Sequence, residues 1–213
     1  MTSILKADTI QDTDGNNIIN ESGNTITIGA SGDTVDIPSG ATFDATGATI
    51  TGITQGITVA DQFRLSANVS FSSTTDFTSN LERIDTSGQG GMTDNQMSES
   101  SGIFTFPLTG IYYVQANLIS SISTASRYVN AHILVTTNNS SYSVISEGRA
   151  AGFIAESAAS NNQAFTDTLI DVTDTSNVKV KFQAVSSQTS SNSFQGSTSE
   201  NKTTFLFIRL GDT

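Results

Sequence analysis

The stretch "SGIFTFPLTGIYYVQANL", residues 101–118, decides the fold that the sequence predicts. It places aromatic residues at alternating positions on both sides of a corner, with Phe104 before it and Tyr112 after it. Pro107 presets a turn conformation, and Gly110 accepts backbone angles that other residues avoid. The segment therefore predicts two neighbouring strands that direct Phe104 and Tyr112 into one core.

The rest of the chain extends this β pattern. Hydrophobic residues make up 36% of the 213 residues and charged residues 14%, while Ser, Thr, Asn and Gly are abundant, which favours short strands and turns over long helices. Residues 177–182 alternate strictly between polar and apolar. We expect an all-β sandwich or jelly roll of about eight to ten strands. Eight expected strands span residues 62–71, 102–107, 110–121, 128–137, 142–149, 165–172, 177–185 and 203–210.

Composition changes near residue 58. Before it, large apolar residues are sparse, and Ser-Gly or Thr-Gly turn signals at residues 22, 31, 39 and 46 separate short alternating segments such as 25–28 and 34–37. Such repeats need neighbouring copies to bury their apolar face, so residues 1–58 predict a β-repeat shaft in which three chains intertwine. A disordered linker is the alternative. Residues 59–213 predict a jelly-roll head.

The expected last strand, residues 203–210, is apolar at nearly every position. A strand of this kind is covered on both faces. Two arrangements satisfy that requirement: the outer face packs against another subunit, or the strand is central and lies under a loop.

The charge balance excludes several classes of partner. The net charge is −11 and nine Lys and Arg residues are dispersed, so neither nucleic acid nor an anionic membrane surface is expected to bind.

No stretch approaches the roughly 20 apolar residues of a membrane span. Without cysteine there is no disulfide or thiolate chemistry. The acidic beginning lacks a signal peptide's apolar core, so we expect synthesis in a cytoplasm.

Acidic residues near the beginning of the sequence suggest a calcium site, but their spacing does not fit one. Asp12, Asp14 and Asn16 alternate, but an EF-hand loop requires Gly and Glu where Asn17 and Gly23 stand. We expect a hairpin turn at Asp14-Gly15 instead, and no metal site.

No catalytic motif is present. His132, the single histidine, lies in an apolar strand without a nucleophile elbow nearby and is expected to be structural. The carboxylates Glu147, Glu156 and Asp167 are the residues to test for glycoside cleavage, although we expect no enzyme activity and no cofactor. Polar loops at residues 88–101, 155–163 and 186–200 are either ligand-binding loops or solvated connections.

The pattern Gly102-x-Phe104-x-x-Pro107-x-x-Gly110-x-Tyr112-x-Val114 resembles the motif of the complement-type globular head, the trimeric jelly roll shared with tumour-necrosis-factor-like ligands. Residues 61–85, 132–139, 164–182 and 203–210 are similar to further strands of that family in the same order. The chain lacks Trp and shows Asp174-Thr175-Ser176 where the family has Gly-Asp. The resemblance implies a homotrimer.

"LKADTIQDTDGNNIINESGNTITIGASGDTVDIPSGATFD", residues 5–44, resembles the leader of small fibre proteins of tailed bacteriophages. This resemblance implies a virion location. Residues 1–58 would dock on other virion proteins, and the head would bind a host surface glycan or protein, as in a tail fibre that mediates attachment. The alternative is a capsid-decorating or cement protein without a receptor role.

Overall fold

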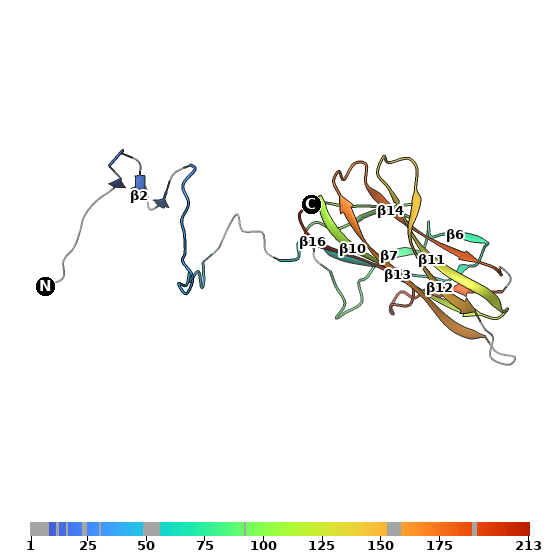
Figure 1. The fold of residues 1–213 in the computed structure, drawn as a ribbon. Helices are drawn as coiled ribbons and strands as arrows, with labels where there is room; N and C mark the ends of the chain where they lie inside the picture. The colour runs from blue at the N-terminus through green and yellow to red at the C-terminus, as the bar shows by residue number, and fades with distance from the viewer. Residues whose placement is uncertain are drawn as a thin grey trace. The chain divides into compact units, whose positions relative to one another are not determined.

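The computed structural model describes residues 9–11, 13–15, 17–22, 25–29, 31–48, 56–91, 93–152, 159–188 and 191–213. The chain divides into two compact units, Met1–Ile53 and Thr54–Thr213. Figure 1 shows both units as a ribbon, and each is described by itself below. The division predicted from composition lies a few residues further along, after residue 58. No helix long and apolar enough to cross a membrane is found among the described residues.

The first unit contains a three-stranded antiparallel sheet of β1 (Thr9–Gln11), β2 (Asn17–Ser22) and β3 (Thr25–Ile28). Gly15, with φ of 87°, completes the predicted turn between β1 and β2, where Ile10 pairs with Ile19. The expected strand at residues 34–37 is wrong, since this segment has no regular structure. It lies between turns at residues 31–32 and 39–40 and runs into Pro38, which cannot donate to a ladder.

The second unit is a sandwich of two antiparallel sheets (Figure 1). Its first sheet has the strand order β5-β15-β10-β16-β4-β7, and β13 pairs with the other edge of β10. These strands are β4 (Ala60–Leu65), β5 (Val69–Ser70), β7 (Leu81–Arg83), β10 (Gly110–Ile122), β13 (Ser160–Val172), β15 (Ser193–Phe194) and β16 (Thr204–Gly211).

The second sheet has the order β12-β11-β14-β9-β8, and β6 also pairs with β14. Its strands are β6 (Thr74–Asp76), β8 (Ser98–Ser100), β9 (Ile103–Thr105), β11 (Ser126–Thr136), β12 (Ser143–Gly152) and β14 (Lys179–Ser186). The two sheets form an all-β jelly roll, as the strand spacing predicts.

Aromatic side chains fill the space between the sheets. Phe104 and Tyr112 are both fully buried, which confirms the prediction from residues 101–118. The Phe104 ring lies 5.4 Å from Phe182 and 5.0 Å from Phe207, so it joins the two sheets. The Tyr112 hydroxyl donates a 2.9 Å hydrogen bond to the Leu108 carbonyl, which ties the corner to the strand that follows it.

Six of the eight expected strands are confirmed within a few residues of their ends as β10, β11, β12, β13, β14 and β16, and residues 102–107 contain the shorter β9. The prediction of one continuous strand over residues 62–71 is wrong, because β4 ends at Leu65 and a bend precedes β5. The loop prediction is also partly wrong: residues 88–101 contain β8, residues 186–200 contain β15, and β13 already begins at Ser160. These polar strands pair with neighbours that give them regular hydrogen bonds despite their composition.

Candidate functional site

The outward-facing side of the first sheet exposes a cluster of large apolar residues. Alternation along β10 buries Tyr112 and Val114 in the core and leaves Tyr113 half-buried on the opposite side. Leu169 on β13 and Ile208 on β16 pair directly with Tyr113 and share that side. Leu169 is 60% exposed. We call the outward-facing residues Tyr113, Phe165, Leu169, Leu206 and Ile208 the apolar face.

A hydrogen bond orders the centre of the apolar face. The Tyr113 hydroxyl donates to Asp167 Oδ2 at 2.7 Å, joining β10 to β13. The pKa of Tyr113 is raised, and this hydrogen bond is the largest cause, because the neighbouring carboxylate favours the protonated phenol. The tyrosine ring is therefore held beside Leu169 and Ile208 by a partner on its own sheet.

The last strand is central, as the second sequence interpretation requires, whereas cover of its outer side by another subunit stays a prediction. β16 is central in its sheet, between β10 and β4, and Phe205 and Phe207 point into the core. Leu206 and Ile208, on its other side, are half-buried, and Leu210 is 55% exposed. The expectation that this strand is covered on both faces is thus not met within a single chain.

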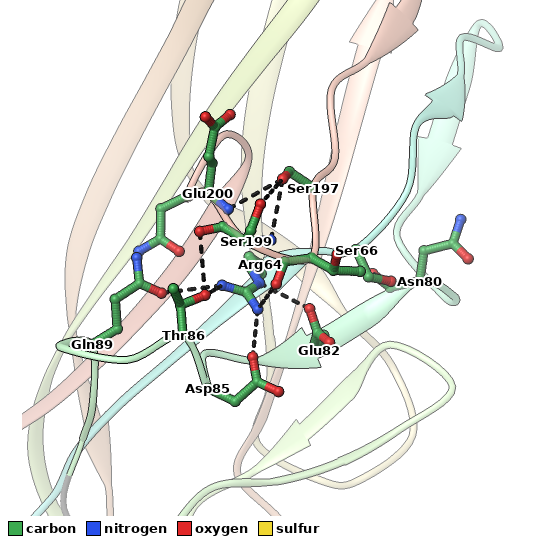
Figure 2. A network of polar contacts seen from close by, with 12 residues as sticks. Arg64, Ser66, Asn80, Glu82, Asp85, Thr86, Gln89, Ser197, Ser199 and Glu200 are labelled. Atoms are coloured by element: carbon green, nitrogen blue, oxygen red, sulfur yellow. Dashed lines mark hydrogen bonds and ion pairs between the residues drawn. The ribbon is translucent and has the colours of Figure 1, made fainter.

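Another part of the outward-facing side of the first sheet is covered by segments of the same chain. Figure 2 shows the network of polar contacts around Arg64 in this part. Arg64 pairs with Thr204 across β4 and β16 and is fully buried. Its guanidinium donates to Glu82 Oε2 at 2.8 Å and to Asp85 Oδ1 at 2.6 Å. It also donates to Thr86 Oγ1, Gln89 Oε1 and the Thr198 carbonyl oxygen.

The Arg64 cluster (Arg64, Glu82, Asp85, Thr86 and Gln89) fixes two segments that are distant in sequence. Residues 84–91 follow β7, and residues 195–203 connect β15 to β16. Both segments close over one guanidinium, whose charge-assisted hydrogen bonds stabilise their positions. The sequence pattern did not predict this cluster, although a charged residue between Phe63 and Leu65 in an apolar strand was a detectable signal.

A row of polar residues crosses the outward-facing side of the second sheet. Asp76, Gln183, His132 and Glu147 lie opposite one another in register across β6, β14, β11 and β12. Gln183 Nε2 donates to Asp76 Oδ1 at 2.8 Å, and His132 Nε2 lies 2.8 Å from Glu147 Oε2. This polar row contrasts with the apolar face on the other sheet.

His132 is a hydrogen-bond partner of Glu147, and its structural role stays a prediction. Arg149 Nε donates to Glu147 Oε1 at 2.5 Å, and Asn130 Nδ2 lies 3.1 Å from Oε2. The bond from Arg149, followed by that from His132, lowers the pKa of Glu147 because both favour the carboxylate.

The predicted test residues for glycoside cleavage are not brought together. Glu147 on β12 contacts His132 on β11, whereas Asp167 on β13 accepts from Tyr113. Glu156 lies outside the described residues, as do Asp12 and Asn16 of the calcium interpretation. Within the described part of the chain, no group of three or more His, Cys, Asp or Glu side chains is arranged to hold a metal ion.

Comparisons with known proteins identify the fold of the second unit. No protein-family model matches the chain, and no curated protein matches it in sequence. Among solved structures, the Eiger TNF from S. frugiperda is similar with a TM-score of 0.54 and 12% identity, over 75% of this chain and 96% of that one. Murine APRIL at pH 5.0 is similar with a TM-score of 0.50 and 9% identity, over 71% and 98%.

The similarity extends over nearly the whole length of both TNF-family structures and agrees with the all-β sandwich described above. At 12% and 9% sequence identity, this similarity shows a shared fold alone. The head of this chain therefore has the jelly-roll fold of the TNF-like proteins.

Proposed function

We propose that the chain is a virion structural protein of a tailed bacteriophage, a homotrimeric fibre that attaches the particle to its host. Its N-terminal part docks on other virion proteins, and its jelly-roll head contacts a host surface glycan or protein. The work is non-covalent, without catalysis. Three heads on one fibre would raise the effective affinity of weak single contacts.

The apolar face is the observation that supports this proposal most directly. Leu169, Tyr113 and Ile208 form a continuous row across three strands, and the single chain leaves Leu169 largely exposed. An exposed apolar patch of this kind usually marks a surface that binds a partner. A TNF-like jelly roll is compatible with a homotrimer, in which this side of each head would pack against its neighbour.

The first unit supports the same assembly independently. Among its described residues, the large apolar side chains are exposed in the single chain: Ile10, Ile18, Ile19, Ile26, Ile28, Val35, Ile37 and Phe43 are between 37% and 70% exposed. The described part of this small sheet buries no large apolar side chain, and a fold of this size without a core is not stable alone. Two further copies would convert the exposed stripe into a shared interior, and the leader resemblance adds the virion context.

Two measurements on the purified full-length chain test the proposal. Light scattering should return three times the 22.3 kDa chain mass, about 67 kDa. Fluorescently labelled protein should then bind intact host cells. A monomeric mass with a folded first unit would contradict the fibre assembly.

Labelled protein also separates the two virion roles. Binding to host cells and not to emptied phage heads supports attachment. Coating of emptied heads, with a rise in their melting temperature and no binding to cells, would replace attachment by capsid decoration.

A further inference from the structure

A pocket opens on the second sheet where β14 changes partner along one edge. β11 occupies the other edge of β14. On this edge, β9 pairs with residues 179–180 and β6 pairs with residues 183–185, so residues 181–182 lie between the two short strands. The pocket is lined by residues 76–78, 101–103, Tyr142 and residues 181–182. We call it the edge pocket.

One wall of the edge pocket is rigid. Ser101 and Gly102 form the two-residue turn between β8 and β9, with φ of 52° and 82°. A Cβ atom on Gly102 would lie 2.3 Å from the Phe77 carbonyl oxygen, so the turn packs directly on the segment after β6. The Gly102 N–H donates to Glu99 Oε1 at 2.6 Å. The wall is thus formed before any ligand arrives, which lowers the entropy cost of binding.

The size of the edge pocket suits one six-membered ring. Its volume is about 140 Å³. An apolar cavity of roughly 150 Å³ in another protein holds one benzene molecule. A single sugar ring is of a size that this space can hold.

Both charged groups beside the pocket can bind hydroxyl groups, because the Asp76 carboxylate has further acceptor positions besides the one that accepts from Gln183 Nε2. Lys181 Nζ lies 3.8 Å from Asp76 Oδ1, longer than the roughly 2.7–2.9 Å of a charged hydrogen bond. The ammonium lies 5.0 Å from the centre of the Tyr142 ring, a cation–π contact that holds it in place. Lys181 donates and Asp76 accepts, so two adjacent hydroxyls of one ligand would satisfy both. The opposite charges sum to zero, which favours a neutral ligand over an ion.

Tyr142 and Ile103 supply the apolar surface that a sugar ring needs. Tyr142 is half-buried, and Ile103 is 36% exposed at the pocket. The Tyr142 hydroxyl is protonated at neutral pH, as in any tyrosine, and burial raises its pKa further from the ordinary value of 10.0. A pyranose has one face of C–H groups and a rim of hydroxyls, which matches apolar walls beside a donor and an acceptor.

We propose that the edge pocket binds one pyranose unit of a neutral saccharide, with adjacent hydroxyls bridging Asp76 and Lys181. Each head carries its own pocket, outside the apolar face that the proposed trimer buries. The inference rests on the proposed attachment function for the biological source of the sugar, because a host surface glycan is the partner that attachment requires.

Saturation-transfer difference NMR on the full-length protein tests the pocket, with the methyl pyranosides of glucose, galactose, mannose and N-acetylglucosamine as probes. At least one should receive saturation from the protein. Lys181→Ala and Tyr142→Ala should each weaken its binding about tenfold or more, the loss expected for one charged hydrogen bond or one stacking surface. Lys179→Ala is the matched control, since Lys179 lies on the same strand two residues away and does not line the pocket, and its binding should be unchanged.

Three results would overturn the inference: no probe binds, binding survives both pocket variants, or methyl glucuronide binds while every neutral glycoside fails. Cell labelling distinguishes this failure from failure of the proposed function. If wild-type and Lys181→Ala proteins label host cells equally and no glycoside binds, attachment stands and the sugar pocket is wrong. If a glycoside binds in a Lys181-dependent way but no host cell is labelled, the pocket stands and attachment is wrong.

Discussion

Arg64 donates a 2.8 Å hydrogen bond from Nε to Glu82 Oε2 while its own side chain is completely excluded from solvent. The pair joins two adjacent strands of the first sheet, at the end of the side that also carries the apolar face. This buried cation thereby holds the segments that cover its part of the sheet, while Leu169 on the same side stays 60% exposed in the single chain.

Replacing Arg64 by Met should lower the free energy of unfolding of the head by about 3 kcal/mol, because several charge-assisted hydrogen bonds are lost together. Urea denaturation measures the loss. The control Arg127→Met removes an exposed arginine on β11 and should change stability by less than about 0.5 kcal/mol. Equal effects of the two substitutions would show that the Arg64 cluster does not stabilise the fold.

Gly148→Ala should destabilise the head by about 3 kcal/mol or more. A Cβ atom at this position would lie 1.6 Å from the Phe165 carbonyl oxygen, so β12 and β13 would have to separate. Thermal unfolding followed by circular dichroism measures the effect. Gly90→Ala is the control, because its Cβ would meet no atom within 4 Å. A Gly148→Ala protein with wild-type stability would contradict the close packing of these strands.

Leu169→Lys should dissociate the proposed trimer without unfolding the head. Leu169 is 60% exposed in the single chain, so the lysine meets water in the monomer but a desolvated surface in the assembly. Light scattering should show a fall in mass toward one chain, with an unchanged far-ultraviolet spectrum. Val144→Lys, at a 47% exposed site on the other sheet, should leave the mass unchanged. If Leu169→Lys keeps the wild-type mass, the apolar face is not the subunit interface.

Glu147 should make stability depend on pH in the acid range. Its folded-state pKa is lowered from 4.5 by hydrogen bonds from Arg149 and His132, so the stabilisation is complete above that value and is lost as pH falls through and below it. Glu147→Gln should therefore flatten the fall in stability between neutral and acid pH, measured by urea denaturation at a series of pH values. An unchanged pH profile in this variant would assign the acid sensitivity to other carboxyl groups.

The alternation of residues was enough to predict most of the head. Phe104, Tyr112 and residues 177–182 were correctly placed because side chains in a strand alternate between two faces, and that period is visible in any single segment. The polar strands β8 and β15 and the early start of β13 were missed, because their pairing with neighbours, and not their composition, makes them strands.

The candidate sites were less accessible to sequence reasoning. Glu147 and Asp167 looked alike as acidic residues in strands, yet one contacts His132 and Arg149 and the other Tyr113. Periodicity reports which side of a strand a residue occupies, and it does not report which strand lies beside it.

The sequence by itself determined that this protein is a β sandwich with an apolar-poor leading segment, since composition and two-residue periodicity are local properties. Only the tertiary structure decided that Arg64 meets Thr198, 134 residues away, and that Lys181 lies beside Asp76 and Tyr142. Those contacts depend on the order of strands in the two sheets. Strand order is set by long-range pairing and by the packing of the shared core, which no short segment encodes.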